Sequence, residues 1–279
     1  MSEYRYRIVN VFTRNGGKFT GNPLAVFEDG TGLSTETMQA LARQMNLSET
    51  TFIMPSAKAT AGVRIFTPAF EMPFAGHPTL GTAHVVRSLK GGDEVTLDMK
   101  AGVIPVKARG DCWTLSANKP SSREVGVTRA VLAGTLGLAE AEIGSQPLWV
   151  NTGSEQLIVP VTSLAAVDRC STATVKLGAL TNNLGRGMAY VFHDDGKQVT
   201  ARFFFPNMGA VLEDPATGSA CANLGGWFVA TGAARPLSRI VSQGEKIDRP
   251  STLLLSVDAA GSVFVGGEVV ELGRGTLTL

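Results

Sequence analysis

Two short motifs, far apart in the chain, place a side chain capable of hydrogen bonding immediately before a proline. His77 precedes Pro78, Asp214 precedes Pro215, and each proline opens an apolar stretch rich in small residues. Because proline is favoured at the first position of a helix, we expect His77 and Asp214 at or next to the N-caps of two buried helices. Aspartate is a good N-cap and histidine a poor one, so the histidine indicates another use for its ring.

The small residues after each proline should leave backbone N–H groups open at the two helix starts. They are Thr79, Gly81 and Thr82 in the first motif, and Thr217, Gly218 and Ser219 in the second. Open N–H groups and the helix dipole attract anions at a helix N-terminus. Two such ends facing each other across a cleft would hold a substrate carboxylate or its enolate-like transition state. Two well-capped core helices are the simpler alternative.

Glu49 is a third residue that could do chemistry. It lies in Ser48–Thr51, between the end of one expected helix and the start of an expected strand. A carboxylate at such a junction can be aimed into a cleft, where it would act as a general acid or base. Taken alone, the residue is interpreted more simply as a solvated loop glutamate.

The sequence before each proline motif also recurs. Arg64–Pro68 (RIFTP) precedes the His77 motif, and Arg202–Pro206 (RFFFP) precedes the Asp214 motif. The recurrence predicts a strand followed by a buried helix in each half of the chain, which indicates duplication of one fold. The polar stretch Asn118–Thr128 is the expected boundary, giving halves at 1–120 and 128–279. The extreme C-terminal strand could pack back on the first half.

Short apolar runs bounded by Gly, Asn, Asp and Pro predict strands, because they are rich in β-branched residues. These runs are Tyr6–Phe12, Leu24–Phe27, Thr51–Met54, Gly62–Phe66, Val95–Met99, Val103–Ala108, Leu148–Val150, Leu157–Val161, Met188–Phe192, Thr200–Phe205, Thr252–Val257 and Ser262–Val265. Apolar periodicity predicts a helix over Ser34–Asn46. Mostly uncharged stretches predict buried helices over Pro78–Lys90 and Pro215–Ala230, and Thr128–Leu136 and Ser171–Leu180 are weaker candidates. The expected fold class is α+β with sheets dominating.

Composition narrows the possible partners. The formal net charge is +1, without a basic stripe, so we expect neither nucleic acid nor a membrane surface as a partner. No apolar run reaches the length of a bilayer span and the first residues lack a signal-peptide core, which predicts a cytoplasmic location. The three cysteines are scattered and His77 and His84 have no evident third ligand, so we expect neither disulfides nor a metal site.

Several segments together resemble the PhzF family, named for phenazine biosynthesis and related in fold to diaminopimelate epimerase. They run in family order over almost the whole chain, and the Gly-His-Pro and Asp-Pro-x-x-Gly-Ser-Ala blocks are the most specific of them. The segments are Val11–Phe12, Gly21–Phe27 (GNPLAVF), Asn46–Phe52 (NLSETTF), Phe66–Pro68, Pro73–Ala83 (PFAGHPTLGTA), Glu213–Ala220 (EDPATGSA), Ser242–Glu245 and Arg249–Ser251.

The resemblance implies two pseudo-symmetric halves, each a barrel-like β-sheet wrapped around a central helix, with a cleft between them. It implies no cofactor, and commonly a homodimer. Carried onto this sequence, it makes Glu49 the acid/base residue, with His77 and Asp214 completing the catalytic set. The substrate-binding residues would then be Asn22, Gly76, Thr79, Gly81, Gly218, Ser219 and Ala220.

The expected function is a cofactor-independent isomerase or epimerase that moves a proton within a small carboxylate-bearing metabolite. Glu49 would remove the proton and return it elsewhere on the same face of the substrate. One alternative is a two-base racemase resembling diaminopimelate epimerase, which carries a cysteine at each helix start; here Cys221 lies inside the second expected helix. The other alternative is a non-catalytic protein that binds a small carboxylate in the same cleft.

Overall fold

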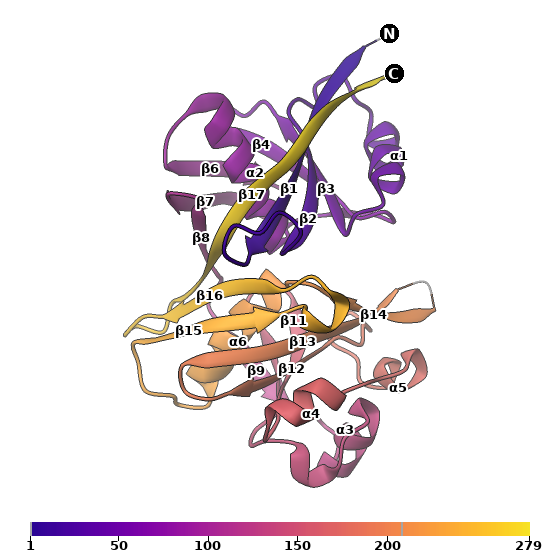
Figure 1. The fold of residues 1–279 in the computed structure, drawn as a ribbon, viewed down its shortest axis with the longest axis vertical. Coiled ribbons are helices and arrows are strands. Elements are labelled where there is room, and N and C mark those ends of the chain that lie inside the picture. Colours follow the sequence, from indigo (N-terminus) through magenta and orange to yellow (C-terminus); the bar gives the residue numbers. More distant parts are fainter. Residues whose placement is uncertain (1, 208) are drawn as a thin grey trace. The chain divides into compact units, whose positions relative to one another are not determined.

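The computed structural model describes residues 2–207 and 209–279, which form two compact units (Figure 1). The first unit comprises Met1–Ser116 and Gly266–Leu279, and the second comprises Ala117–Val265. Strands dominate both units and helices are few, which confirms the α+β class. Within the described ranges, no helix combines the length and apolar character needed to cross a membrane.

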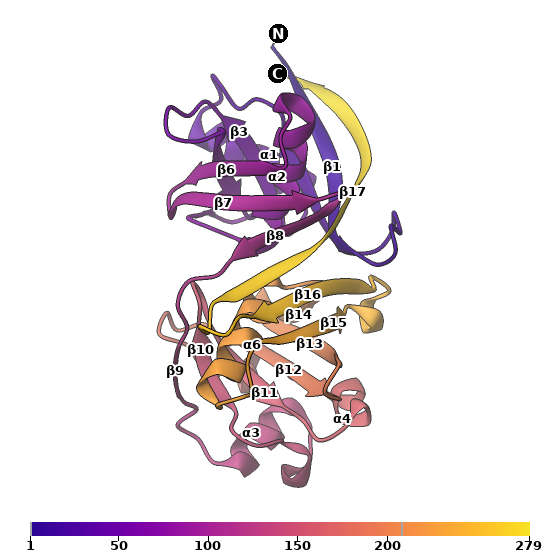
Figure 2. The same ribbon diagram turned by 90° about the vertical axis from the view of Figure 1, so that its left-hand side faces the viewer.

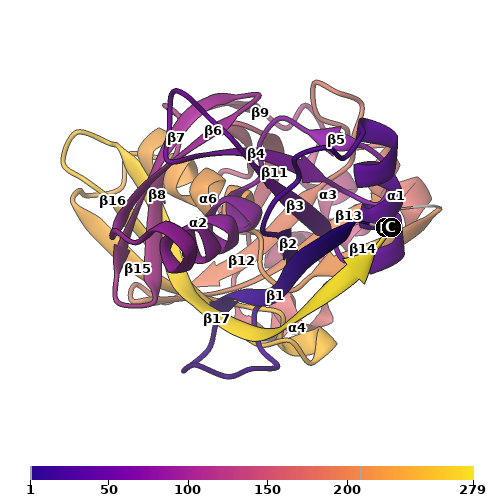
Figure 3. The same ribbon diagram turned by 90° about the horizontal axis from the view of Figure 1, so that it is seen from above.

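The strands of the first unit close into a barrel. Pairing runs from β1 to β2, β3, β4, β6, β7, β8 and β17 and returns to β1, while the short β5 extends β4. Helix α2 (Gly76–Lys90) lies inside the ring, as Figure 3 shows from above. The strands are β1 (Glu3–Thr13), β2 (Asn22–Phe27), β3 (Glu49–Met54), β4 (Ala61–Phe66), β5 (Glu71–Met72), β6 (Glu94–Met99), β7 (Gly102–Arg109), β8 (Cys112–Ser116) and β17 (Val263–Thr278).

Helix α1 (Thr35–Met45) packs on the outside of this barrel. Ser34 caps it by accepting a hydrogen bond from the Thr37 N–H group. Its buried face, which includes Met38 and Leu41, joins Phe27, Phe52 and Phe66 of the barrel wall in one apolar cluster. This packing fixes the point from which the chain enters β3.

The second unit repeats the plan around α6 (Gly218–Ala230). That helix contacts β9, β10, β11 and β16 (Figure 2). The strands are β9 (Ser121–Glu124), β10 (Leu148–Asn151), β11 (Glu155–Pro160), β12 (Ala189–Asp194), β13 (Gln198–Asn207), β14 (Ala210–Asp214), β15 (Leu237–Gln243) and β16 (Ser251–Val257). The remaining helices are α3 (Arg129–Leu136), α4 (Leu164–Arg169) and α5 (Thr174–Gly178), with short 3₁₀ turns η1 (Glu140–Glu142) and η2 (Glu245–Ile247).

The two units share one topology. In the first unit β2–β3 and β4–β6 are parallel, and in the second β11–β12 and β13–β15 are parallel. A helix lies in the connection between the strands of each parallel pair, as such crossovers require. The expected strand followed by a buried helix is therefore present in each unit.

The repeated Arg-x-Phe sequence has a matching structure in both units. Arg64 pairs with Glu71 at 2.8 Å and lies over the Phe66 ring, and Arg202 pairs with Glu213 at 2.7 Å and lies over the Phe204 ring. The pairing register is also the same, because Phe66 faces Glu71 across β4 and β5 as Phe204 faces Glu213 across β13 and β14.

The expected boundary stretch differs from the structure. Asn118–Thr128 is polar, yet its residues Ser121–Glu124 form β9, which pairs with β10 inside the second unit. The units therefore divide after Ser116 rather than at residue 120. The chain end from Gly266 belongs to the first unit, because β17 pairs there with β1. The boundary between the units and the place of the chain end both depend on backbone pairing, which composition does not reveal.

Candidate active site

Glu49 is the first residue of β3, opposite Leu24 of β2. Helix α1 ends at Asn46, whose left-handed backbone (φ 52°) turns the chain toward this strand. The Glu49 side chain is only 16% exposed. It is therefore a partly shielded carboxyl group rather than a solvated loop glutamate.

His77 lies directly beside that carboxyl group. Its Nε2 atom is 3.3 Å from Oε2 of Glu49, and its side chain is buried in the second position of α2. Burial lowers the pKa of His77 to about 3, because a charged ring loses its hydration there. Near neutral pH the contact thus joins an uncharged imidazole, which can donate one hydrogen bond and accept another, to a carboxyl group.

Helix α2 begins one residue before His77. Gly76 is its first residue, and the N-cap Ala75 offers no side-chain hydrogen bond. Pro78 is therefore the third helical residue, and the expectation that it comes first is wrong. The N–H groups of Gly76 and His77 consequently lie at the positive end of the helix dipole without a capping side chain.

The remaining predicted binding residues of the first unit lie in its packed interior. Asn22 is fully buried at the start of β2. The Thr79 hydroxyl donates to the Ala75 carbonyl at 2.7 Å, and a Cβ atom on Gly81 would lie 2.7 Å from Cδ2 of Leu24. Packing of α2 within the barrel accounts for Thr79 and Gly81 without a ligand.

In the second unit, Asp214 ends β14 and lies outside α6. The expected capping role of Asp214 is corrected, because the N-cap is Thr217. Thr217 makes no capping bond: its hydroxyl donates to Oδ2 of Asp214 at 2.5 Å and accepts from Nε2 of Gln243 at 3.0 Å. Gln243 also donates to the Asp214 carbonyl at 2.8 Å. The carboxylate is thereby fixed beside a helix start whose N-cap residue makes no capping bond of its own.

Ser219 is the second residue of α6, flanked by the buried Gly218 and Ala220. Its hydroxyl accepts a hydrogen bond from Gln156 Nε2 at 2.9 Å, and Gln156 in turn contacts Asn223 at 2.7 Å. Neither Gln156 nor Asn223 was predicted from the sequence. A usable signal was present, since an asparagine inside an otherwise apolar buried helix must find a partner.

The structure also corrects how the two proline motifs correspond. The helices begin at Gly76 and Gly218, so Glu71–His77 (EMPFAGH) matches Glu213–Ser219 (EDPATGS) without a gap. This match agrees with the pairing of Phe66 with Glu71 and Phe204 with Glu213. His77 therefore corresponds to Ser219, and Asp214 corresponds to Met72. Pairing Pro78 with Pro215 displaces the two motifs by five residues, because Pro215 corresponds to Pro73 instead.

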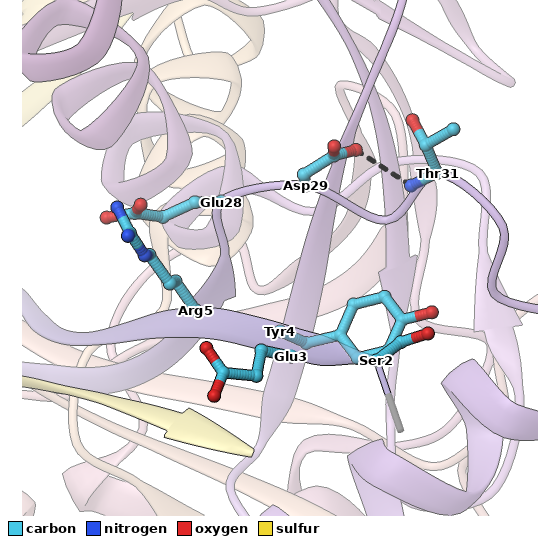
Figure 4. A pocket seen from close by; sticks show the side chains of 7 residues that line it. All are labelled: Ser2, Glu3, Tyr4, Arg5, Glu28, Asp29 and Thr31. Carbon is cyan, nitrogen blue, oxygen red and sulfur yellow. Dashed lines mark hydrogen bonds between the residues drawn. The ribbon is translucent and has the colours of Figure 1, made fainter. Parts of the chain in front are cut away.

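The structure thus brings Glu49 and His77 together in the first unit, and Asp214 and Ser219 near one helix start in the second. A separate surface depression contains none of these residues (Figure 4). It is polar, and its Asp29 carboxylate accepts the Thr31 N–H group at 2.8 Å. The residues that line it are Ser2, Glu3, Tyr4, Arg5, Glu28, Asp29 and Thr31. Across residues 2–207 and 209–279, no group of three or more His, Cys, Asp and Glu side chains could hold a metal ion.

Comparison with known proteins shows what the whole chain is similar to. The family model described as phenazine biosynthesis-like protein matches residues 9–275. An uncharacterized isomerase of Pasteurella multocida is 39% identical over 99% of this chain and 95% of its own length. The trans-2,3-dihydro-3-hydroxyanthranilate isomerase of Pseudomonas chlororaphis is 32% identical over 99% of this chain and 100% of its own.

Solved structures show the same fold. A predicted epimerase from Pseudomonas aeruginosa superposes with a TM-score of 0.81 at 31% identity, covering 99% of both chains. A PhzF family protein of Bacillus anthracis reaches 0.87 at 22% identity over 100% of both chains. A hydroxyproline epimerase from Agrobacterium vitis shares the fold more distantly, with a TM-score of 0.62 at 14% identity, covering 99% of this chain and 93% of its own.

Proposed function

This chain belongs to the PhzF family of phenazine biosynthesis-like isomerases, and we propose that Glu49 is the acid/base residue of its reaction. One observation carries the proposal: the Glu49 carboxyl group lies 3.3 Å from the buried imidazole of His77. Since His77 is uncharged near neutral pH, its ring offers Glu49 a neighbour that is able to donate or to accept, which suits either protonation state of the carboxyl group.

The proposed step is a proton transfer within the substrate. Glu49 breaks a C–H bond by taking the proton, and the electron pair left on carbon delocalises toward an adjacent unsaturated or carboxyl group. The open N–H groups at the start of α2 favour that negative charge. Glu49 then returns the proton to another carbon, or to the same carbon, which gives isomerisation or epimerisation respectively.

Comparison of the two units favours a single base. Thr50 faces Phe66 across β3 and β4, and Ala189 faces the equivalent Phe204 across β12 and β13. The residue that corresponds to Glu49 is therefore Met188, which cannot transfer a proton. One carboxylate used twice fits this asymmetry better than two equivalent bases.

We propose a small carboxylate as the substrate, of the cyclic or amino-acid-like type. Relatives 32% identical over 99% of this chain are named for the isomerisation of trans-2,3-dihydro-3-hydroxyanthranilate, a cyclic amino carboxylate. The uncapped N-terminus of α6, with Ser219 and Asp214 beside it, offers donors for a carboxylate and an acceptor for an amino group.

The test is solvent deuterium uptake by candidate carboxylates in D₂O. Glu49→Gln should fold normally and lower uptake by about 10²–10⁴-fold, the usual contribution of a positioned acid or base. Glu94→Gln is the matched control, because Glu94 lies on the surface of the same unit. Uptake by Glu49→Gln at the wild-type rate would refute the assignment of Glu49.

The two-base racemase is the second candidate, and the cysteines argue against it. The second positions of the two helices hold His77 and Ser219 rather than cysteine. Cys221 is fully buried, which raises the pKa of its thiol well above the ordinary range. Iodoacetamide should therefore leave deuterium uptake intact. Inactivation that substrate prevents would instead favour a cysteine base, and tight calorimetric binding without any uptake would favour a non-catalytic binding protein.

We further propose that the reaction needs no cofactor and that the chain forms a homodimer, as the family resemblance implies. Undiminished uptake after exhaustive dialysis against a chelator would support the first point. Sedimentation at twice the mass of one chain would support the second.

A further inference from the structure

A chain of hydrogen bonds inside the second unit leads from the backbone of Thr152 to the hydroxyl of Ser219. Asn223 Oδ1 accepts from the Thr152 N–H group at 2.8 Å and from its hydroxyl at 2.7 Å. Asn223 Nδ2 donates to the Ser154 carbonyl at 2.8 Å and to Gln156 Oε1 at 2.7 Å. Gln156 Nε2 donates to Ser219 Oγ at 2.9 Å.

The polarity of this chain is fixed by the backbone. An N–H group can only donate and a carbonyl can only accept, so Thr152 and Ser154 leave Asn223 one possible amide orientation. Asn223 then presents a donor to Gln156, which must turn its oxygen inward and its NH₂ group toward Ser219. Because Ser219 accepts that bond, its own hydrogen points away from Gln156.

The first unit has no amide at the corresponding position of its central helix. Gln156 and Asn223 are 3% and 0% exposed, so their amides would be costly to bury without a purpose. In the first unit the position equivalent to Asn223 is Gly81, counted from the helix starts at Gly76 and Gly218. Gly81 packs against Leu24, so at this position the first unit holds its central helix by apolar contact.

We propose that Gln156 and Asn223 are positioning residues that hold Ser219 as a hydrogen-bond donor toward the carboxylate of the substrate. The inference rests on the proposed function for the presence of a carboxylate ligand. It adds a rule for specificity: the ligand group that faces Ser219 should be one that only accepts hydrogen bonds, rather than one that must donate. A carboxylate satisfies that rule and a carboxamide does so only in part.

The test measures selectivity by calorimetry with anthranilate, a stable amino carboxylate, and with anthranilamide. Wild-type protein should bind anthranilate more tightly. Asn223→Asp replaces the donor to Gln156 by an acceptor. The Gln156 amide should then flip, so that its oxygen accepts a hydrogen bond from the Ser219 hydroxyl, which no longer donates to the ligand. We expect anthranilate affinity to fall about tenfold, in the range for a lost bond to a charged group, while anthranilamide affinity changes less than threefold.

Two controls separate this effect from charge and from misfolding. Gln198→Glu adds the same charge at an exposed position of the second unit and should leave the selectivity unchanged. In a Ser219→Ala background, Asn223→Asp should have less than a threefold effect on anthranilate, because the group it acts through is gone. If Asn223→Asp does not fold, Gln156→Glu is substituted, since its carboxylate also draws the Ser219 hydrogen inward.

Three results would overturn the proposal. Asn223→Asp could lower the affinities for both ligands equally, or lower anthranilate affinity just as much in the Ser219→Ala background. The wild-type protein could also bind anthranilate no more tightly than anthranilamide. The outcome is distinct from that for Glu49. Unchanged selectivity together with an inactive Glu49→Gln protein removes only the positioning role, whereas altered selectivity with an active Glu49→Gln protein removes only the acid/base assignment.

Discussion

The buried His77 ring is harder to protonate in the folded protein than in the unfolded chain. Its pKa falls from the ordinary value of 6.5 to about 3 in the barrel. Between these values the unfolded chain binds a proton that the folded chain excludes, so stability decreases as pH falls below about 6.5. Above that pH the ring is neutral in both states and contributes no pH dependence.

We therefore predict that about 2 kcal/mol of the free energy of unfolding is lost through His77 between pH 7.5 and pH 5, at a limiting slope of about 1.4 kcal/mol per pH unit. His77→Asn should lose this component while remaining folded. Urea unfolding of both proteins at the two pH values measures the difference. An identical loss in the variant would contradict the buried, uncharged state of the ring.

Single residues also mark the limit of what the sequence could show. His77 and Asp214 attract notice by their position before proline, and Glu49 only through the family resemblance. Gln156 is 63 residues from Ser219 and 67 from Asn223, so their contacts arise only when β11 packs against α6. No local pattern encodes a hydrogen bond of that separation, although the polarity of Asn223 within an apolar helix hints at a partner.

At the scale of elements, helix interiors are predictable and helix starts less so. The small-residue stretches predicted both central helices, which end at Lys90 and Ala230 as expected. Their starts at Gly76 and Gly218 differ from the proline positions, because the fixed φ of proline suits a loop as well as a first helical turn. The strands that were missed, including β14 and β15, are short or alternate buried and exposed residues, so no continuous apolar run reveals them.

We predict that Gly81 of α2 contributes to stability because the surrounding side chains leave no room for a larger residue. A Cβ atom on Gly81 would lie 2.7–3.1 Å from Leu24, Val11 and Val9, whereas one on Gly134 of α3 would meet nothing within 4 Å. Gly81→Ala should therefore destabilise the fold by about 1–3 kcal/mol through overpacking. Gly134→Ala should stabilise it by up to about 1 kcal/mol, since alanine favours the helix. Thermal unfolding of the two variants distinguishes these outcomes, and equal shifts would refute close packing at Gly81.

At the scale of the whole molecule, the sequence predicted two copies of one fold, and the shared order of parallel pairs and central helices shows that repetition. The copies have diverged in chemistry. The first carries Glu49 and His77, and the second carries the amide network behind Ser219. Each of these two groups of residues therefore depends on the strand pairing of the unit that carries it.

The wall of the first unit depends on the far end of the chain. Strand β17 pairs with β1 from Glu3 to Thr13 and also pairs with β8, so it closes the ring around α2. Deleting residues 266–279 should open the barrel, expose the backbone of β1 and β8, and abolish deuterium uptake by displacing the Glu49–His77 pair. Deleting only residues 277–279 removes the paired positions Leu277 and Thr278 and the two backbone hydrogen bonds between Leu279 and Ser2, and should cost less than about 1 kcal/mol, since chain ends fray.

Hydrogen exchange read by mass spectrometry tests this dependence in both units at once. The longer deletion should remove protection from β1 and β8 while β12 and β13, which pair within the second unit, keep theirs. A synthetic peptide of residues 266–279 added in trans should restore protection to β1, because it supplies the missing ladder of backbone hydrogen bonds. Unaltered protection of β1 after the longer deletion would show that the first unit holds its barrel without the returning strand.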